Sequence, residues 1–528
     1  MTSSDLPSSD ARPAPGLPSL ARRSFLGLGL GAGAALALAA CGGATVTTAG
    51  SGPAGGRNGT LKWGWALPTS WDPVFSSAGW DVHVLSLVYA GLTKLDESGK
   101  AVPALASAWT YNADGTKLTF TLRPGLVFED GSPLDADAVK QSLDRGRTDP
   151  KSLVAPQLTQ VKQVTAPDAA TVVIELTGPD YQLPNLLAGK TGLVVNPRAF
   201  ATDAAALASK PAGAGPFSLV SYTQNAKAVL KRNPHYWDAG SIELENFEVH
   251  PLPDAATVVG GLQSGQFDVA QIPGSQVEAA KAAGLEVQEI PSLVVAVLDV
   301  NTAKAPFDNP DVVQALKYAI DREALVKTQL FGHGEANYQP FPKGYVGYDP
   351  GSADLFRYDP DKARALLAKA GHPDGVELTL TTTAAQGLPE QLQAQLKQVG
   401  IKAAIEVVPA AQATQIVYVQ HSKALFTDQF AGRDSAAQAF QVLFGEQGLM
   451  NPGRSTPPEL LAAVQQVSRT PLDSPDYPKA LQAATALAVR TMPNVFLYSV
   501  PRLLARRKSV SAIPAFTVVQ RFEGVSVS

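Results

Sequence analysis

The chain has 528 residues, with 43 Lys and Arg against 47 Asp and Glu, and a formal net charge of −4. A single hydrophobic core stops growing near roughly 250–300 residues, so two or three domains are expected. The chain has no basic excess, which argues against nucleic acid as a partner.

The N-terminal segment has the pattern of an export signal. Arg22 and Arg23 form a positively charged start, and Phe25 follows at the spacing of a twin-arginine signal. The apolar stretch of residues 24–40 is shorter than the ~20 residues that a stable membrane-spanning helix needs, and its glycines weaken it as a helix. We therefore predict a signal peptide over residues 1–40 that is cleaved. The alternative is a short anchor helix.

The only cysteine of the chain, Cys41, stands at the predicted cleavage point. It follows Leu-Ala-Ala and precedes Gly, which resembles the lipobox of bacterial lipoproteins. That resemblance implies a lipid on Cys41, which becomes the first residue of the mature chain. A lone cysteine excludes an internal disulfide and a cysteine-pair zinc site. The glycine-rich residues 41–57 are expected to form a flexible linker between the membrane and the folded body.

The first half of the folded body is predicted to be α+β. Leu61, Trp63 and Trp65 alternate with other residues as in a strand, and residues 82–92 are typical of a helix. No later stretch approaches 18 uninterrupted apolar residues, so no further membrane span is expected.

Turn signals are dense between residues 106 and 139. Two alternating runs flank Asp114-Gly115, a pair that tolerates the positive φ of a tight hairpin turn. Asp135 is a suitable N-cap for the helix that follows. Residues 172–176 alternate again. These signals predict antiparallel pairing in this part.

The second half has a different pattern. Asn309 and Asp359 each precede a proline and an apolar helical stripe, as at a helix start. Further on, a strand pattern over 376–380 is followed by a helix pattern over 389–399 and another strand pattern over 401–407. Strand, helix and strand at this spacing form a βαβ unit, which makes the two strands parallel.

Four blocks of residues in the body resemble the solute-binding proteins of ABC importers, family 5. The first block is the longest, and it combines aromatic residues with tight turns. The blocks occur in the family's order and together cover about residues 60–510. They are Ala106-Ser-Ala-Trp109 with Phe120-Thr-Leu122-Arg123-Pro-Gly125 and Phe128-Glu-Asp130-Gly131; Gly213-Ala-Gly215-Pro216-Phe217 with Arg232-Asn233-Pro234-His-Tyr236-Trp237; Leu262-Gln-Ser-Gly265-Gln-Phe-Asp268; and Phe307-Asp308-Asn309 with Ala319-Ile320-Asp321-Arg322.

The resemblance implies an α/β, two-lobed periplasmic-binding-protein fold of type II, with crossover strands between the lobes and an extra α+β subdomain on the first. The expected boundaries are 58–290 for lobe I with the subdomain at about 96–212, 291–490 for lobe II, and 491–528 for the return to lobe I.

The resemblance also implies a function. The chain is expected to hold a small solute, with a short peptide as the first choice, in a cleft that closes like a trap, and to deliver it to a membrane permease. Anchored through Cys41, it would work as a monomer on the outer face of the bacterial cytoplasmic membrane. The alternatives are a peptide-sensing receptor of the same fold, a binder of a nickel chelate or oligosaccharide, and an extracellular hydrolase.

Peptide-binding relatives hold the α-amine of the peptide with an aspartate in a loop of the second lobe. The similar segment here makes Asp434 the candidate, because a carboxylate in a closed cleft is costly unless it meets a cation. Relatives often have proline after this aspartate, whereas this chain has Ser435. Asp434 could instead cap the loop. Arg433 could balance a ligand carboxylate or neutralise Asp434.

The other candidates are less specific. Trp71 and Trp80 stand where the family places residues that line the cleft, and either could stack on the solute or pack in the core. Tyr498 and Asn451 are weaker candidates. Within the blocks, structural roles are expected: Trp109 and Trp237 as core anchors, and Arg123 and Arg322 paired with carboxylates.

Nothing in the sequence recommends an enzyme. The 6 histidines are scattered without metal-ligand spacing. Neither the nucleophile elbow of hydrolases nor the glycine patterns of nucleotide sites occur. No catalytic residue, metal or cofactor is expected.

Overall fold

The computed structural model describes residues 59–252 and 254–528. The predicted export signal, Cys41 and the linker lie outside the described residues, so these remain predictions. The described residues belong to one compact unit. Among the described residues, no helix is long and apolar enough to cross a membrane.

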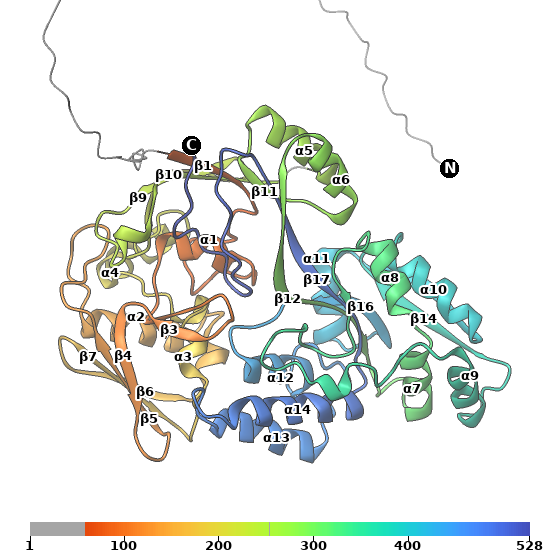
Figure 1. The fold of residues 1–528 in the computed structure, drawn as a ribbon. Helices are drawn as coiled ribbons and strands as arrows, with labels where there is room; N and C mark the ends of the chain where they lie inside the picture. Colours follow the sequence, from red (N-terminus) through yellow and green to blue (C-terminus); the bar gives the residue numbers. More distant parts are fainter. Residues whose placement is uncertain (1–58, 253) are drawn as a thin grey trace, which may run out of the picture. The chain divides into compact units, whose positions relative to one another are not determined.

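An 11-stranded mixed sheet connects the two halves of this unit (Figure 1). The strand order is β15-β14-β16-β12-β17-β11-β1-β10-β9-β8, with β13 beside β17. The strands are β1 (Gly59–Gly64), β8 (Phe217–Thr223), β9 (Lys227–Arg232), β10 (Leu244–His250), β11 (Val269–Gln271), β12 (Glu286–Val300), β13 (Glu335–Ala336), β14 (Val376–Thr382), β15 (Ile401–Val407), β16 (Leu425–Phe430) and β17 (Val495–Arg506).

Two smaller sheets lie in the first half. Strands β4, β5, β7 and β6 pair antiparallel in that order, and β2 pairs with β3. Their bounds are β2 (Thr93–Leu95), β3 (Ala101–Pro103), β4 (Ala106–Tyr111), β5 (Lys117–Leu122), β6 (Val161–Asp168) and β7 (Thr171–Leu176). The predicted hairpin is confirmed, since β4 and β5 flank Gly115, which has φ +70°.

The helices that the sequence predicts begin within one residue of the expected positions. Their bounds are α1 (Asp81–Val88), α2 (Ala136–Thr148), α3 (Leu183–Leu186), α4 (Pro197–Asp203), α5 (Ala255–Ser264), α6 (Val277–Ala282), α7 (Pro310–Tyr318), α8 (Arg322–Gln329), α9 (Pro360–Lys369), α10 (Leu388–Gln398), α11 (Ala410–Thr414), α12 (Ala436–Phe444), α13 (Pro458–Arg469) and α14 (Tyr477–Thr491). The side chains of Asp135, Asn309 and Asp359 accept hydrogen bonds from the first turns of α2, α7 and α9, which confirms the three N-caps.

The βαβ unit of the second half is also confirmed. Strands β14 and β15 pair in parallel over their whole length, and α10 connects them. The first half is mainly antiparallel, although β1 pairs in parallel with β10 and β11.

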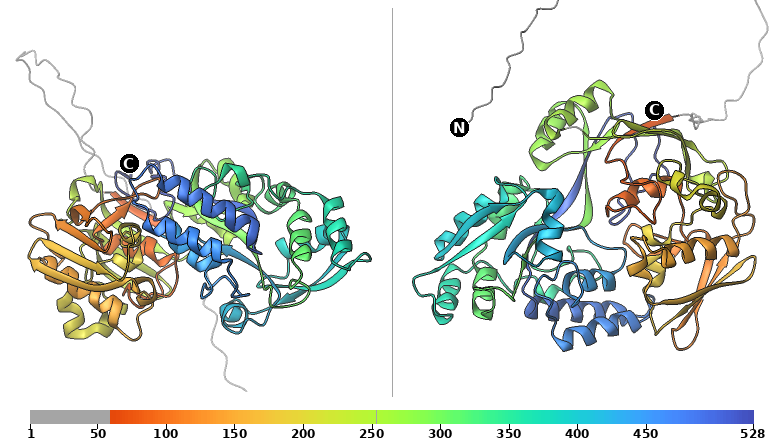
Figure 2. Two further views of the ribbon diagram at one scale, coloured as in Figure 1. Left: turned by 90° about the horizontal axis from the view of Figure 1, so that it is seen from below. Right: turned by 180° about the vertical axis from the view of Figure 1, so that it is seen from behind.

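The long strands β12 and β17 join the two halves. They pair antiparallel: Glu286 stands opposite Arg506 at one end, and Leu298 stands opposite Val495 at the other. The register shifts after Ile290. The first-lobe core contains residues of β1, α1, α2 and β10, and from the two long strands it includes Ile290 of β12 and Leu504 of β17. Two other cores start on these strands beyond the shift. The strands therefore run from one lobe into the other, as crossover strands do (Figure 2). The predicted domain boundaries remain predictions.

The second block of the family pattern has a packing role. Gly213 and Gly215 pass so close to Val88 that a Cβ on either glycine would collide with its backbone. The amide of Gly215 donates to the Val88 carbonyl at 3.0 Å. This approach fixes the end of α1, which stops at Val88 rather than continuing through 92 as the sequence predicts.

The two block arginines are structural, but the prediction that they pair with carboxylates is wrong. Arg123 donates from Nε to the Ala104 carbonyl at 2.6 Å, and its guanidinium lies 4.3 Å from the ring centroid of Trp237. Arg322 is buried and donates to the backbone carbonyls of Phe496, Lys317, Ile320 and Phe356. Clustered carbonyl oxygens replace a carboxylate as the acceptors.

Candidate functional site

The loop after β16 carries Asp434, the candidate for the solute's amine. Gly432 adopts φ +75° and lies against Leu293 of β12, leaving no room for a Cβ. Ser435 caps α12, because its hydroxyl accepts from Gln438 N at 3.2 Å. The serine therefore orders this loop where relatives often have proline, and the loop is fixed between a crossover strand and a helix.

The carboxylate of Asp434 faces the first lobe. It occupies the place where a Cβ of Gly189 would stand, so the missing side chain of that glycine makes room for it. No described residue makes a hydrogen bond or ion pair with Asp434, whose side chain is half-buried. Burial raises the pKa of Asp434 to about 6, while Arg433 and Lys190 oppose that shift. The site thus holds a carboxylate without a partner.

Lys190 belongs to the first lobe and lies near Asp434 without pairing with it. Its ammonium donates to the carbonyls of Ser76 at 2.7 Å and Ala78 at 3.2 Å. Burial lowers the pKa of Lys190, and the nearby Asp81 and Asp434 oppose this. Lys190 therefore ties the chain beside Asp434 to the loop that precedes α1.

Direct hydrogen bonds connect the two lobes near this site. Tyr181 N donates to Ser468 O at 2.8 Å, and Tyr477 OH donates to Gln182 Oε1 at 3.0 Å. Ser468 lies in α13 and Tyr477 is the first residue of α14. These two helices lie side by side (Figure 2). Residues 181–182 of the first half are therefore in direct contact with α13 and the start of α14.

Arg433 is half-buried beside Asp434. Its Nη1 donates to the Gly432 carbonyl at 2.5 Å, and its guanidinium lies 5.2 Å from the ring centroid of Phe430. Burial lowers the pKa of Arg433, while Asp434 and Asp428 raise it. Arg433 is thus placed near Asp434 without forming an ion pair with it.

A buried network lies behind Arg433. Tyr418 OH is 2.5 Å from both Asp299 Oδ2 and Asp428 Oδ2, and Asn494 donates to Asp299 Oδ1 at 2.9 Å. A hydroxyl has one hydrogen, so a proton of the carboxyl pair must make the second contact. Burial accordingly raises the pKa of both carboxyls. The pair shares a proton and presents less than two negative charges to Arg433.

The other predicted residues lie in different settings. Trp80 is 55% exposed at the start of α1, next to the loop held by Lys190. Trp71 is fully buried in the first-lobe core, edge-on to Tyr222. Asn451 is buried, and its amide donates to neighbouring carbonyls of its own loop.

Tyr498 is buried within β17, opposite Ala296 of β12. Burial raises its pKa to about 12. The structure therefore brings together Asp434, Arg433 and the region of Trp80, and it places Trp71, Asn451 and Tyr498 in packed interiors. Lys190 was missed, because no sequence pattern links it to a loop far away in the chain.

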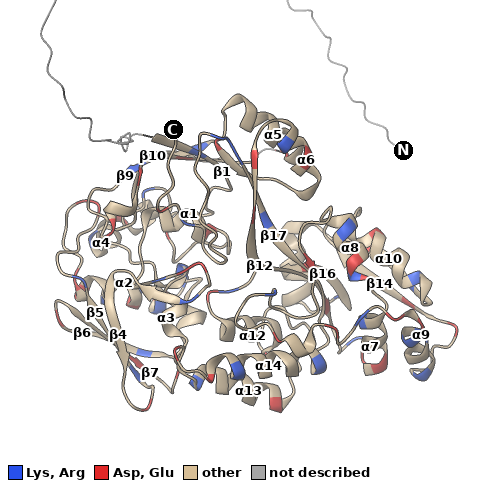
Figure 3. Ribbon diagram, viewed as in Figure 1, with Lys and Arg blue, Asp and Glu red and all other residues tan. Residues whose placement is uncertain are grey.

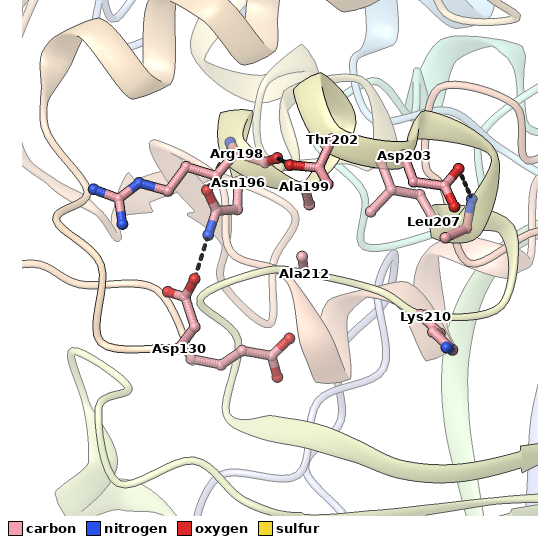
Figure 4. Close-up of a pocket in the computed structure, with 11 residues that line it drawn as sticks. Asp130, Asn196, Arg198, Ala199, Thr202, Asp203, Leu207, Lys210 and Ala212 are labelled. Carbon is pink, nitrogen blue, oxygen red and sulfur yellow. Dashed lines mark hydrogen bonds between the residues drawn. The ribbon is translucent and has the colours of Figure 1, made fainter.

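A separate cavity of about 360 Å³ lies on the first lobe (Figure 4). Its lining residues all fall between Glu129 and Ala212, and none comes from the second lobe. Asp130 already accepts hydrogen bonds from Ser132 and Asn196. We do not assign the solute to this cavity.

Among the described residues, neither the distribution of charged side chains nor a cluster of metal-binding side chains indicates a second candidate site. Lys and Arg are interspersed with Asp and Glu over the ribbon (Figure 3). No group of three or more His, Cys, Asp or Glu side chains in residues 59–252 and 254–528 is placed to hold a metal ion.

Comparison with known proteins gives a consistent set of similarities. The model of the family "Bacterial extracellular solute-binding proteins, family 5 Middle" matches residues 100–451. The glutathione-binding protein GsiB of Salmonella paratyphi A is 33% identical over 394 residues, which cover 72% of this chain and 76% of GsiB.

Two solved structures are similar over most of the chain. The periplasmic binding protein DppA of Helicobacter pylori, in complex with peptide STSA, has a TM-score of 0.78 at 22% identity and covers 89% of this chain and 98% of its own. AgaA of A. tumefacien R10, in complex with agropinic acid, has a TM-score of 0.76 at 26% identity, with 89% and 99% covered.

Proposed function

Because the chain belongs to the bacterial extracellular solute-binding proteins of family 5, we propose that it captures a short peptide with a free α-amino group between its two lobes. The general role follows from the family: the chain is a solute-binding component of an ABC importer. The predicted two-lobed type II fold is confirmed by the solved structures that match it. The choice of a peptide is our proposal.

Asp434 is the observation that supports a peptide. Its carboxylate is half-buried, has no partner among the described residues and faces the opposite lobe across Gly189. An ammonium group satisfies such a carboxylate better than a hydroxyl does, because an ion pair compensates the lost solvation of the charge. The α-amine of a peptide supplies that ammonium at neutral pH.

The similar proteins agree with this choice. GsiB is named a glutathione-binding protein, and the DppA structure contains a peptide. A nickel chelate and an oligosaccharide remain the alternatives to be tested. A sensing role of the same fold would use the same site.

The proposed site consists of Asp434 for the amine, Arg433 beside it, and Trp80 as an exposed aromatic surface on the first lobe. We leave Trp71, Asn451 and Tyr498 out of the site, since packing or backbone hydrogen bonds account for each of them. We further propose that the chain is exported, lipidated at Cys41 and monomeric, and that the closed form docks on a permease. Relatives are substrate-binding transport proteins, and we propose that this chain too releases its solute unchanged.

Ligand binding is expected to stabilise the folded body. The compact unit without residues 1–57, mixed with a library of short peptides, should gain about 2.7 kcal/mol at a hundredfold excess over Kd. Thermal unfolding measures this gain, and N-acetylated copies of the same peptides serve as the control because they lack the ammonium. A gain from a nickel chelate or an oligosaccharide, with none from the peptides, would contradict the proposal. Accumulation of a hydrolysed product would point to an enzyme instead.

A further inference from the structure

One lysine stands beside two carboxylates, one from each half of the molecule. Lys190 is partly buried and begins a short 3₁₀ turn. Burial and Arg433 lower the pKa of Lys190, whereas the nearby Asp81 and Asp434 raise it. Among the described residues its hydrogen bonds go only to neutral oxygens, so it is paired with neither carboxylate. The ammonium thus lies near two negative charges without being bound to either.

The hydrogen bonds of Lys190 explain why it does not turn toward Asp434. Its Nζ donates to Ser76 O at 2.7 Å, to Ala78 O at 3.2 Å and to Ser76 Oγ at 3.5 Å. An ammonium has three N–H donors, and these three contacts use all of them. Lys190 is therefore held by the first lobe and acts on Asp434 through its charge alone.

Asp81 fixes the loop that holds the ammonium. It is 1% exposed, and its Oδ2 accepts from Thr69 N at 3.1 Å, from Thr69 Oγ1 at 2.5 Å and from Ser76 Oγ at 2.6 Å. Its Oδ1 is buried without a hydrogen-bond partner. A buried carboxylate is costly unless a cation lies close, and Lys190 is such a cation. Asp81 and Lys190 therefore stabilise each other's charge and both contact Ser76.

The backbone next to Lys190 brings Asp434 close to it. A Cβ on Gly189 would stand 2.0 Å from Oδ2 of Asp434, so the carboxylate lies directly against this backbone. The other titratable groups near Asp434 are Arg433, on its own loop, and Tyr345. Tyr345 stays neutral, because burial raises its pKa further above the physiological range. Among the described residues, Lys190 is thus the cation that the first lobe places near Asp434.

We propose that Lys190 is a positioning residue: a counter-charge, held out of hydrogen-bonding distance, that keeps Asp434 ionised while leaving its carboxylate free for the ammonium of the solute. A lysine paired directly with Asp434 would occupy the site. Without a nearby cation, an enclosed carboxylate would take up a proton and lose its attraction for an amine. The inference rests on the proposed function, which supplies the amine that Asp434 receives.

Asp81 has a part in the same device. When the ammonium of the solute binds Asp434, a second positive charge comes close to Lys190. Asp81 remains as the anion that balances Lys190, and the loop oxygens keep the lysine in place. The lysine therefore need not move or lose its proton when the solute arrives.

The variant K190Q tests this role, because its amide can still donate to the loop carbonyls but carries no charge. Trialanine binding is measured by titration calorimetry at pH 5 and pH 7. At pH 7 the affinity of K190Q should lie within about threefold of the unaltered protein, and at pH 5 it should be about tenfold lower, because Asp434 then takes up its proton at a higher pH. K190R keeps the charge and should follow the unaltered protein. So should the control K162Q, since Lys162 is exposed on β6.

Two results would overturn the inference. If K190Q lost the same factor of affinity at pH 5 and at pH 7, Lys190 would only support the loop or would contact the solute itself. If K190R had the pH profile of K190Q, the charge of the lysine would not be the property that matters. In both cases the proposed function would stand, because trialanine binds.

A measurement on the empty protein separates this inference from the proposed function. Thermal unfolding of the unaltered protein, K190Q, D434N and the double variant gives the coupling between the two charges. The coupling should be favourable at pH 7 and largely absent at pH 5, where Asp434 is mostly protonated. If no peptide binds but this coupling is found, the proposed function fails and the role of Lys190 is supported. The absence of coupling at pH 7 rejects that role whether or not peptides bind. K190M replaces K190Q if the latter does not fold.

Discussion

Replacing Asp434 with asparagine is expected to weaken the binding of a free-amine peptide by about 2–5 kcal/mol, as loss of one partner of a buried charge pair does. The amide keeps the size of the side chain but has no charge to offset the ammonium that the closing lobes remove from water. Titration calorimetry of D434N against the unaltered protein measures the change. Asp473, an exposed carboxylate of the second lobe, provides the control D473N, which should bind normally.

The unaltered protein is expected to bind the peptide with a characteristic pH dependence. The pKa of Asp434 is raised to about 6. Above this pH the carboxylate is charged and pairs with the ammonium, and below it affinity should fall about tenfold for each pH unit. The folding stability of the empty protein depends on pH in the opposite direction. A raised folded-state pKa gives stability that is complete below the ordinary value of about 3.9 and is lost as the pH rises through 6.

D434N should remove both dependences. Asp434 would be excluded from the site if D434N bound peptides as tightly as the unaltered protein. The same conclusion would follow if the affinity of D434N fell below pH 6 as steeply as that of the unaltered protein.

Replacing Arg145 with alanine is expected to destabilise the first lobe by about 3–5 kcal/mol, because it leaves a buried carboxylate without its counter-charge. Arg145 donates from Nη1 to Asp72 Oδ1 at 3.1 Å and from Nη2 to Oδ2 at 2.5 Å, and Asp72 is 0% exposed. Asp72 also holds the turn after Trp71 through the amide of Val74. Denaturant unfolding measures the loss.

Arg232 provides the matched control for this pair. It forms a partly exposed ion pair with Glu245 at 2.8 Å, and R232A should cost about 0–1 kcal/mol. If R145A and R232A lost the same free energy of unfolding, burial would not make the Arg145–Asp72 pair more important for stability than an exposed pair. Replacing Arg145 and Asp72 together by Met and Leu should cost less than R145A alone, because no buried charge is left unpaired.

The fold was largely predictable wherever the signal is local. Asp135, Asn309 and Asp359 are caps because each side chain can reach an amide in the helix it precedes. The turn at Gly115 needs the positive φ that glycine adopts easily. Such signals depend on neighbours within a few residues, and a single sequence contains them.

The site was predictable only in part, because its residues meet through the tertiary fold. Asp434 was found through a resemblance, and its closeness to Gly189 and Lys190 comes from the contact between the lobes. Arg322 shows the same limit: its charge suggested a carboxylate, whereas four carbonyl oxygens from separate segments converge on it.

Small-angle X-ray scattering on the folded body, empty and saturated with a peptide that binds, tests the central claim most directly. Two lobes on crossover strands that grip a solute between them should give a smaller radius of gyration when the peptide is present, since hinge closure brings the lobes together. A scattering profile that stays the same at saturation, while calorimetry shows the peptide bound, would contradict the account.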